Sequence, residues 1–294
     1  MTVVWRDFSA LSRPILILAF EGWFDVAEAA TGAVRWLANH YDADDVAGID
    51  PEPYFDFTAR RPEVKLVDGE RIIEWPANDC AVARLPEHGH DLVLLAGIEP
   101  HLRWQNFCQD LIEVIRTTAA ELVITLGATA DAVPHSRPPL VKGSSTTAAL
   151  ASTLGLDRPS YQGPTGLIGV LHDRLDREHI PVISLRASVP HYVASSPNPK
   201  ATLALLQHLE HVTGVPTAHS GLVRVAEAWE RQVDAAVSAD DEVGAYVRRL
   251  EEQNDRRLVQ DLPSGEDLAA QFEQFLREQR PDEGPPPGPG PAGG

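Results

Sequence analysis

Four cationic side chains are the first candidates for chemistry: Arg103, Arg137, Lys142 and Lys200. Two of them are lysines in a chain that has only three, the third being Lys65. Each lies in a segment that follows a run typical of a buried strand, and ligands of parallel sheets bind beyond the carboxyl ends of the strands. Cations that meet there can hold a phosphate or carboxylate against helix N-termini. The sequence therefore predicts an anion-binding site at this edge.

The same segments carry groups able to transfer protons or to contact a ligand. Glu21 or Asp25 could act as a base or bind a ribose, and His191 could transfer a proton. The ligand contacts expected besides the four cations are Trp23, Tyr161, Thr165 and Asn198. Structural alternatives exist for several of them, because Asp25 and Asn198 suit helix caps and Trp23 could cover the sheet edge.

Standard phosphate-binding and catalytic motifs are missing from the sequence. It contains no GxxxxGK[ST], GxGxxG, HExxH or GxSxG, so the cofactor stays unknown. Gly163 and Gly166, on either side of Thr165, would let backbone amides approach an anion, although a tight turn explains these glycines equally well.

Apolar runs and helical spacings alternate along the chain. Strands are predicted at 14–20, 91–97, 121–127 and 181–187. Helices are predicted at 26–41, from Trp104 to about Ile115, around 144–153 and from Pro199 to about Val212. Asp25 with Glu28 forms a capping box for the first helix, and Asn198 caps the last. This order predicts an α/β fold with a mostly parallel central sheet and helices on both faces.

Two stretches depart from that alternation. Residues 46–85 contain short alternating pieces between turn signals, which predicts antiparallel strands that extend the sheet or form a flap. After Gly214, amphipathic stripes predict a helical extension, with a last short helix starting at Ser264. We therefore expect an α/β core domain at 1–214 with 46–85 inserted, a helical extension at 215–280, and a disordered Pro/Gly-rich tail at 281–294.

Charge and cysteine content disfavour several classes of protein. The 294 residues carry a formal net charge of −18, which opposes a nucleic-acid surface. Cys80 and Cys108 lack a metal-binding spacing, so we expect no metal site and a reducing compartment. No signal peptide is recognisable, and the longest apolar runs are too short to span a bilayer. We expect a cytoplasmic protein with neither nucleic acid nor membrane as a partner.

Three ordered stretches carry a family resemblance: EGWFDVAEAA, SYQGPTGLIGVL, and the segment from SVPHYV to PNPKATLALLQHLEHVTG. They resemble the proteasome assembly chaperone type 2 family, in particular an actinobacterial branch sometimes labelled ATP-grasp or carboxylate-amine ligase-like. The resemblance implies an α/β core similar to the nucleoside phosphorylase and hydrolase-like fold, added C-terminal helices and homo-oligomers. Eukaryotic relatives act as chaperones of proteasome α-ring assembly. The resemblance supplies no catalytic residues.

Two functions compete at this stage. The first is a non-catalytic assembly or scaffolding protein that forms a homo-oligomer, expected to be a trimer, and binds another protein complex. The family resemblance and the two amphipathic stripes between 220 and 262 favour it. The second is an enzyme acting on an anionic small molecule, such as a carboxylate-amine ligase or a nucleoside phosphorylase or hydrolase, for which the strand-end cations would supply the binding site.

Overall fold

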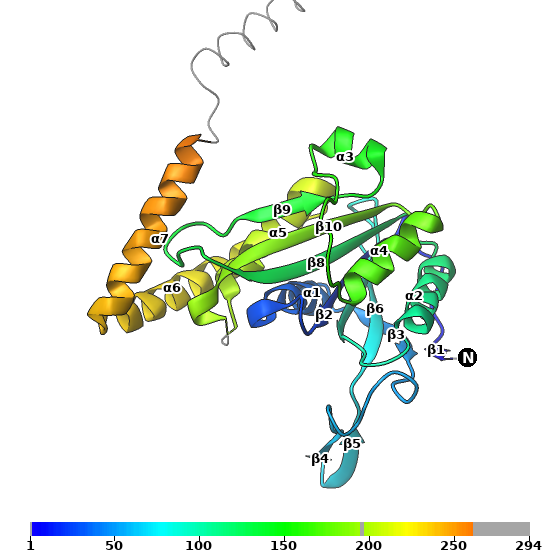
Figure 1. Cartoon of the computed structure of the whole chain (residues 1–294). Coiled ribbons are helices and arrows are strands. Elements are labelled where there is room, and N and C mark those ends of the chain that lie inside the picture. Colours follow the sequence, from blue (N-terminus) through cyan, green and yellow to red (C-terminus); the bar gives the residue numbers. More distant parts are fainter. Residues whose placement is uncertain (1, 195–196, 261–294) are drawn as a thin grey trace, which may run out of the picture.

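Four parallel strands form the centre of an eight-stranded sheet, in the order β7 (Leu92–Ile98), β2 (Ile15–Glu21), β8 (Leu122–Asp131) and β10 (Val182–Pro190). The computed structural model describes residues 2–194 and 197–260 (Figure 1). The strands β2 and β7 are nearly continuous buried apolar runs, as strands covered on both faces require. The predicted parallel centre is confirmed.

Antiparallel strands extend the sheet on both sides. On one side lie β6 (Asn78–Ala83), β3 (Asp44–Ile49) and β1 (Val3–Trp5), and on the other lies β9 (Val141–Ser144). The strand β9 falls in a stretch that the sequence predicted as a loop. It has four residues, of which only Val141 is a typical strand residue, so periodicity gave no signal for it.

Helices cover both faces of the sheet, as predicted. The helices α1 (Ala29–His40) and α5 (Pro199–Thr213) bury Val34 and Leu205 in one core. On the other face, α2 (Trp104–Thr118) and α4 (Leu167–Arg177) bury Leu111 and Leu171 in a second core. A short helix, α3 (Ala148–Leu154), follows β9. These two cores fix the strands and so fix where the strand-end loops lie.

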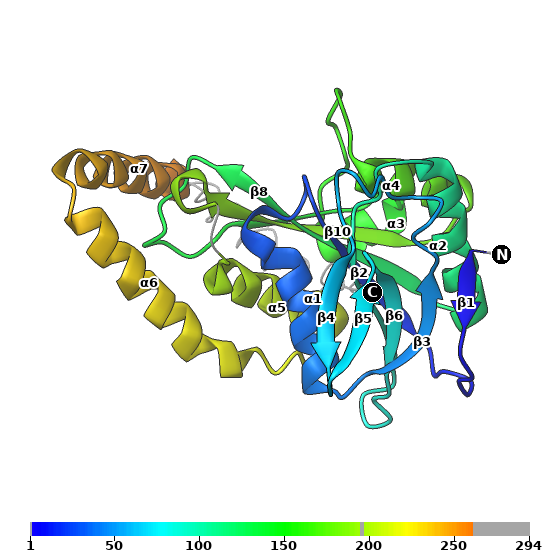
Figure 2. The same ribbon diagram turned by 90° about the horizontal axis from the view of Figure 1, so that it is seen from below.

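Two parts of the chain project from this body. The hairpin of β4 (Glu63–Val67) and β5 (Glu70–Glu74) forms a separate two-stranded sheet (Figure 1). The helices α6 (Val223–Ser238) and α7 (Asp241–Gln260) form an arm that reaches away on the side opposite β1 (Figure 2). Two single turns, η2 (His191–Val193) and η3 (His219–Leu222), precede α5 and α6.

The division into domains stays a prediction. The helix expected from Ser264 and the tail at 281–294 lie outside the described residues. Among the helices of the described part, none has the length and apolar character needed to cross a membrane.

Candidate functional site

The strand-end loops form two separate hollows. The first is a cleft of about 390 Å³ at the ends of β2 and β7. Its lining residues are Glu21, Gly22, Arg60, Ile98, Glu99, Pro100, His101 and Trp104. The second is a small hollow between the β8–β9 loop, the start of α5 and the arm, and its lining includes Arg137, Asn198 and Lys200. Of the predicted site residues, Glu21 lines the first hollow, and Arg137, Asn198 and Lys200 line the second.

Glu21 is held by an arginine from the inserted segment. Two nitrogens of Arg60 donate to the two carboxylate oxygens of Glu21, at 2.7 and 3.2 Å. The hydrogen bonds from Arg60 lower the pKa of Glu21, against the opposing effect of partial burial. A bidentate pair of this kind positions both side chains firmly. Arg60 thereby ties the base of the β4–β5 segment to the end of β2, and sequence reasoning did not find it.

Glu99 occupies the N-terminus of α4. Its carboxylate accepts hydrogen bonds from the Leu167 amide at 2.8 Å and from the Trp23 amide at 3.4 Å. A β-carbon added at Gly166 would lie 2.9 Å from the same carboxylate, so the glycine permits this close approach. The segment from Gly163 to Gly166 was predicted to bring backbone amides close to a bound anion. In this structure the neighbouring Leu167 amide binds the carboxylate of Glu99, which belongs to the chain itself.

Asp25 caps α1 from inside the protein. It is 6% exposed and accepts hydrogen bonds from the Ala30 amide at 2.7 Å and from the amide and hydroxyl of Thr31. Burial raises the pKa of Asp25, and the hydrogen bonds from Thr31 and Ala30 partly offset that effect. The predicted capping box is wrong in detail, because Glu28 pairs with Arg35 and a turn at 26–28 delays α1 until Ala29.

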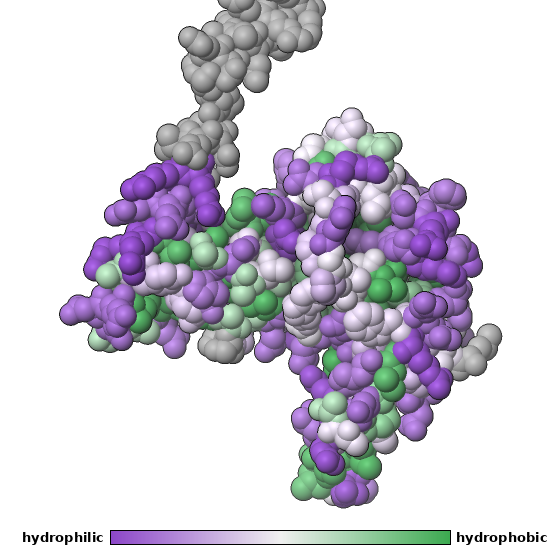
Figure 3. Space-filling model, in the orientation of Figure 1, coloured by the Kyte–Doolittle hydropathy of each residue, from purple (hydrophilic) through white to green (hydrophobic). Residues whose placement is uncertain are grey.

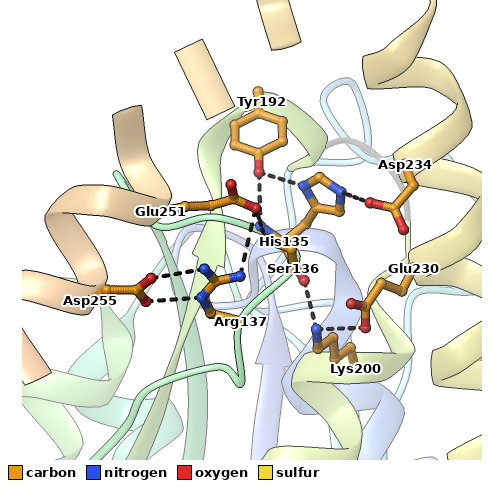
Figure 4. Close-up of polar contacts among 9 residues, drawn as sticks. All are labelled: His135, Ser136, Arg137, Tyr192, Lys200, Glu230, Asp234, Glu251 and Asp255. Atoms are coloured by element: carbon orange, nitrogen blue, oxygen red, sulfur yellow. Dashed lines mark hydrogen bonds and ion pairs between the residues drawn. The ribbon is translucent and has the colours of Figure 1, made fainter. Parts of the chain in front are cut away.

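His135 lies at the centre of a polar cluster that joins the arm to the core (Figure 4). The Tyr192 hydroxyl accepts from the His135 amide at 2.8 Å and lies 2.7 Å from His135 Nδ1. The other ring nitrogen, Nε2, lies 3.0 Å from Asp234 of α6. All contacts are satisfied if Tyr192 donates to Nδ1 and Nε2–H donates to Asp234. Burial raises the pKa of Tyr192 to about 12.

Two predicted cations belong to the same cluster. Lys200 Nζ donates to Glu230 of α6 and to the His135 carbonyl, each at 2.7 Å. Arg137 makes a bidentate pair with Asp255 of α7 at 2.9 and 2.8 Å, and Ser136 donates to Glu251. Both cations therefore bind carboxylates of the arm.

These carboxylate partners were missed by sequence reasoning. They form two pairs at a spacing of four, Glu230 with Asp234 and Glu251 with Asp255. That spacing places each pair on one helical face, next to the apolar stripe. An acidic pair beside a buried stripe is the signal that could have indicated them.

Apart from His191, whose ring packs on Tyr192, the remaining predicted residues lie outside these clusters or serve the backbone. Arg103 is exposed before α2, and Lys142 is exposed on β9 opposite Arg186. Asn198 caps α5 by accepting from the Ala201 amide at 3.0 Å, as predicted. Trp23 and Tyr161 are 65% and 72% exposed, and Thr165 is also exposed. The ring nitrogens of His191 contact the Asp131 carbonyl and Tyr246. A ligand-binding or catalytic role for any of them stays a prediction.

Removing the Tyr192 hydroxyl tests the polar cluster. We expect Tyr192→Phe to lower the free energy of unfolding by about 1–2 kcal/mol, because the buried amide of His135 loses its acceptor. Urea denaturation followed by circular dichroism measures this change. Tyr161→Phe is the matched control, since this side chain is exposed and, within the described part of the chain, its hydroxyl donates only to the Pro164 carbonyl. Equal stability of both variants would contradict the assignment.

Fold and site together define an α/β protein whose strand-end polar groups largely anchor its own helices and loops. The chain belongs to the PAC2 family, whose model matches residues 19–237. A PAC2 family protein from Streptomyces avermitilis is 42% identical, with a TM-score of 0.75, over 80% of this chain and 99% of that one. A proteasome-assembly chaperone homologue from Mycobacterium tuberculosis is 40% identical, with a TM-score of 0.72, over 79% and 99%.

More distant structures share the fold alone. An archaeal proteasome activator from Pyrococcus furiosus is 16% identical, with a TM-score of 0.65, over 80% of this chain and 98% of that one. Comparison with curated proteins gives no match.

Proposed function

We propose that this chain is a homo-oligomeric scaffolding protein that works in the manner of an assembly chaperone. The observation that carries the proposal is the use made of the strand-end polar groups. Lys200, Arg137 and Arg60 bind carboxylates of the chain, and the carboxylates of Glu99 and Asp25 bind amides at the starts of α4 and α1. Groups that would hold a small anion in an enzyme thus hold helices and loops together here.

The proposed partner is a protein complex. A relative 40% identical to this chain is described as a proteasome-assembly chaperone homologue. We therefore propose proteasome α-subunits of the same organism as the partner, a trimer as the oligomeric state, and the cytoplasm as the place of action. The acidic surface, at −18 for the whole chain, would favour basic patches on that partner.

Two measurements test the proposal on the purified 294-residue chain. Light scattering gives the mass in solution, which we expect to be a multiple of 32.1 kDa. Biolayer interferometry against purified proteasome α-subunits is expected to give saturable binding that weakens as salt rises. A strict monomer that does not bind α-subunits would contradict the proposal.

The cleft beside Glu21 favours a second candidate, an enzyme acting on an anionic small molecule. Its volume of about 390 Å³ is in the range of small-molecule sites, and Arg60 and His101 line it. A thermal-shift screen with nucleotides, nucleosides and phosphate discriminates between the candidates. The scaffolding proposal predicts that none of these compounds changes the melting temperature. A saturable rise in melting temperature that Arg60→Ala abolishes would favour the enzyme.

A further inference from the structure

The cleft at the ends of β2 and β7 has a carboxylate left without a cation. Its lining includes two carboxylates, Glu21 and Glu99, and one guanidinium, Arg60. Two nitrogens of Arg60 donate to Glu21, so this cation is committed to a carboxylate of the chain. In the part of the chain that the structure describes, Glu99 pairs with no lysine or arginine, and its hydrogen bonds come from the Leu167 and Trp23 amides. The charge of Glu99 therefore favours a cationic group in the cleft.

The carboxylate of Glu99 is oriented before any ligand arrives. The Leu167 amide holds it at 2.8 Å, and β-carbons added at Gly22 and Gly166 would each lie 2.9 Å from one of its oxygens. An ionised carboxylate offers about four lone-pair sites, and the Leu167 and Trp23 amides use two of them. Glu99 is half-buried and lines the cleft, so the other sites can accept two N–H donors of a ligand at little cost in ordering.

Two tryptophans lie beside this carboxylate. Trp104 lines the cleft, and Trp23, which follows the lining residue Gly22, is 65% exposed. The point where a β-carbon of Gly166 would stand is 3.3 Å from Trp23 Cε3 and 2.9 Å from a Glu99 oxygen, so the indole and the carboxylate are neighbours. A guanidinium can donate two parallel hydrogen bonds to a carboxylate and also stack on an indole. The pair therefore suits arginine better than lysine.

The exposure around the cleft favours a protein as the source of the guanidinium. Hydrophilic residues cover much of the molecule, as Figure 3 shows over α7. Trp23 departs from that surface, and so does Leu102, which follows the lining residue His101 and is 49% exposed. Tryptophan and arginine are enriched among the residues that dominate the energy of protein interfaces. An arginine within a protein segment would bring neighbouring residues over Trp23 and Leu102 as well.

We infer that the cleft receives an arginine side chain of the partner protein, with its guanidinium bound to Glu99 and its plane against Trp23. The inference rests on the proposed scaffolding function and names the contact through which the chain would recognise an α-subunit. An anion in the same place would meet the charge of Glu99, because Arg60 is already bound to Glu21. The net charge of −18 would add long-range attraction for a basic segment.

Glu99→Gln tests this contact, and Glu87→Gln is its matched control. Glutamine keeps an oxygen for the Leu167 amide but removes the charge. Glu87 is an exposed glutamate in the turn before β7, at the other end of that strand, so both substitutions change the net charge equally. Against purified proteasome α-subunits, we expect Glu99→Gln to raise the dissociation constant by about 30-fold or more, and Glu87→Gln by less than about 3-fold. Biolayer interferometry measures both constants.

A small probe examines the cleft without the partner protein. At constant ionic strength, N-acetyl-L-arginine amide is expected to raise the melting temperature saturably, whereas the citrulline analogue, which has a similar shape and no charge, is not. The rise should vanish in Glu99→Gln and persist in Glu87→Gln. Trp23→Leu is expected to raise the dissociation constant of the probe by about 3-fold, because the guanidinium loses the indole face.

The possible results separate the inference from the function on which it rests. If α-subunits bind the wild type and Glu99→Gln equally, or if the arginine and citrulline compounds act alike, the inference is wrong while the scaffolding function stands. Equal losses of binding in the two glutamine variants also overturn it, because the effect would then reflect net charge alone. A wild type that binds no α-subunit overturns the function and the inferred contact together.

Discussion

Lys200→Met is expected to lower the free energy of unfolding by about 2–3 kcal/mol, whereas Lys142→Met should cost less than about 0.5 kcal/mol. The side chain of Lys200 is 14% exposed, and its ammonium is bound by Glu230 and by the His135 carbonyl. It also lies in the first turn of α5, where a cation is unfavourable unless it is paired. Removal of the ammonium leaves the Glu230 carboxylate and the His135 carbonyl without their hydrogen-bond donor, and so loosens α6 from the core.

Lys142 is the matched control for this experiment. It is an exposed lysine on the edge strand β9, and the sequence assigned it the same ligand-binding role as Lys200. Urea denaturation of the two variants at one pH and salt concentration gives the comparison. Similar costs for both lysines would contradict the anchoring role of Lys200. A normal stability for Lys200→Met together with loss of an anion-dependent thermal shift would favour a ligand site instead.

Asp25→Ala is expected to cost about 2–3 kcal/mol, and Asp25→Asn less than about 1 kcal/mol. The side chain accepts hydrogen bonds from buried donors at the start of α1, namely the amides of Ala30 and Thr31 and the Thr31 hydroxyl. Alanine leaves these donors unsatisfied, while asparagine keeps an acceptor oxygen. Because burial raises the pKa of Asp25, its negative charge does not stabilise the fold, and the oxygen atoms matter most.

The pH dependence of the Asp25 effect follows from the direction of its pKa shift. A raised pKa means that the native chain retains a proton at pH values where the unfolded chain has already released it. The stability of the wild type therefore falls as pH rises through that window, above the ordinary aspartate pKa of about 3.9. Asp25→Asn has no such group, so its stability relative to the wild type should improve from pH 3.5 to pH 7. A difference that stays constant, or that changes in the opposite direction, would contradict the role of burial.

The fold was largely predictable because its centre depends on local patterns. Runs such as ILILAF at 15–20 are buried on both faces, and Asn198 followed by Pro199 fixes the start of α5 by cap chemistry alone. The edge strand β9 was missed because four residues beside a parallel strand carry too little periodicity. The delayed start of α1 was missed because it depends on the positive φ angles of Ala27 and Glu28, which no residue type indicated.

The candidate site was less predictable because its contacts are formed by tertiary structure. Strand-end geometry correctly indicated that Lys200 and Arg137 would lie close to one hollow. Their partners, Glu230 and Asp255, are 30 and 118 residues away in sequence and resemble ordinary charged surface of a helix. The strand-end loops line two separate hollows, because the inserted segment brings Arg60 to Glu21 and the arm covers the ends of β8 and β10.

The most direct test of the scaffolding function is a time course of proteasome α-ring formation, followed by native mass spectrometry with and without the purified chain. We predict complexes that contain oligomers of this chain with incomplete sets of α-subunits, and that decline as full rings form. Assembly at an unchanged rate, with no mixed complex at tens of micromolar chain, would contradict the proposed function.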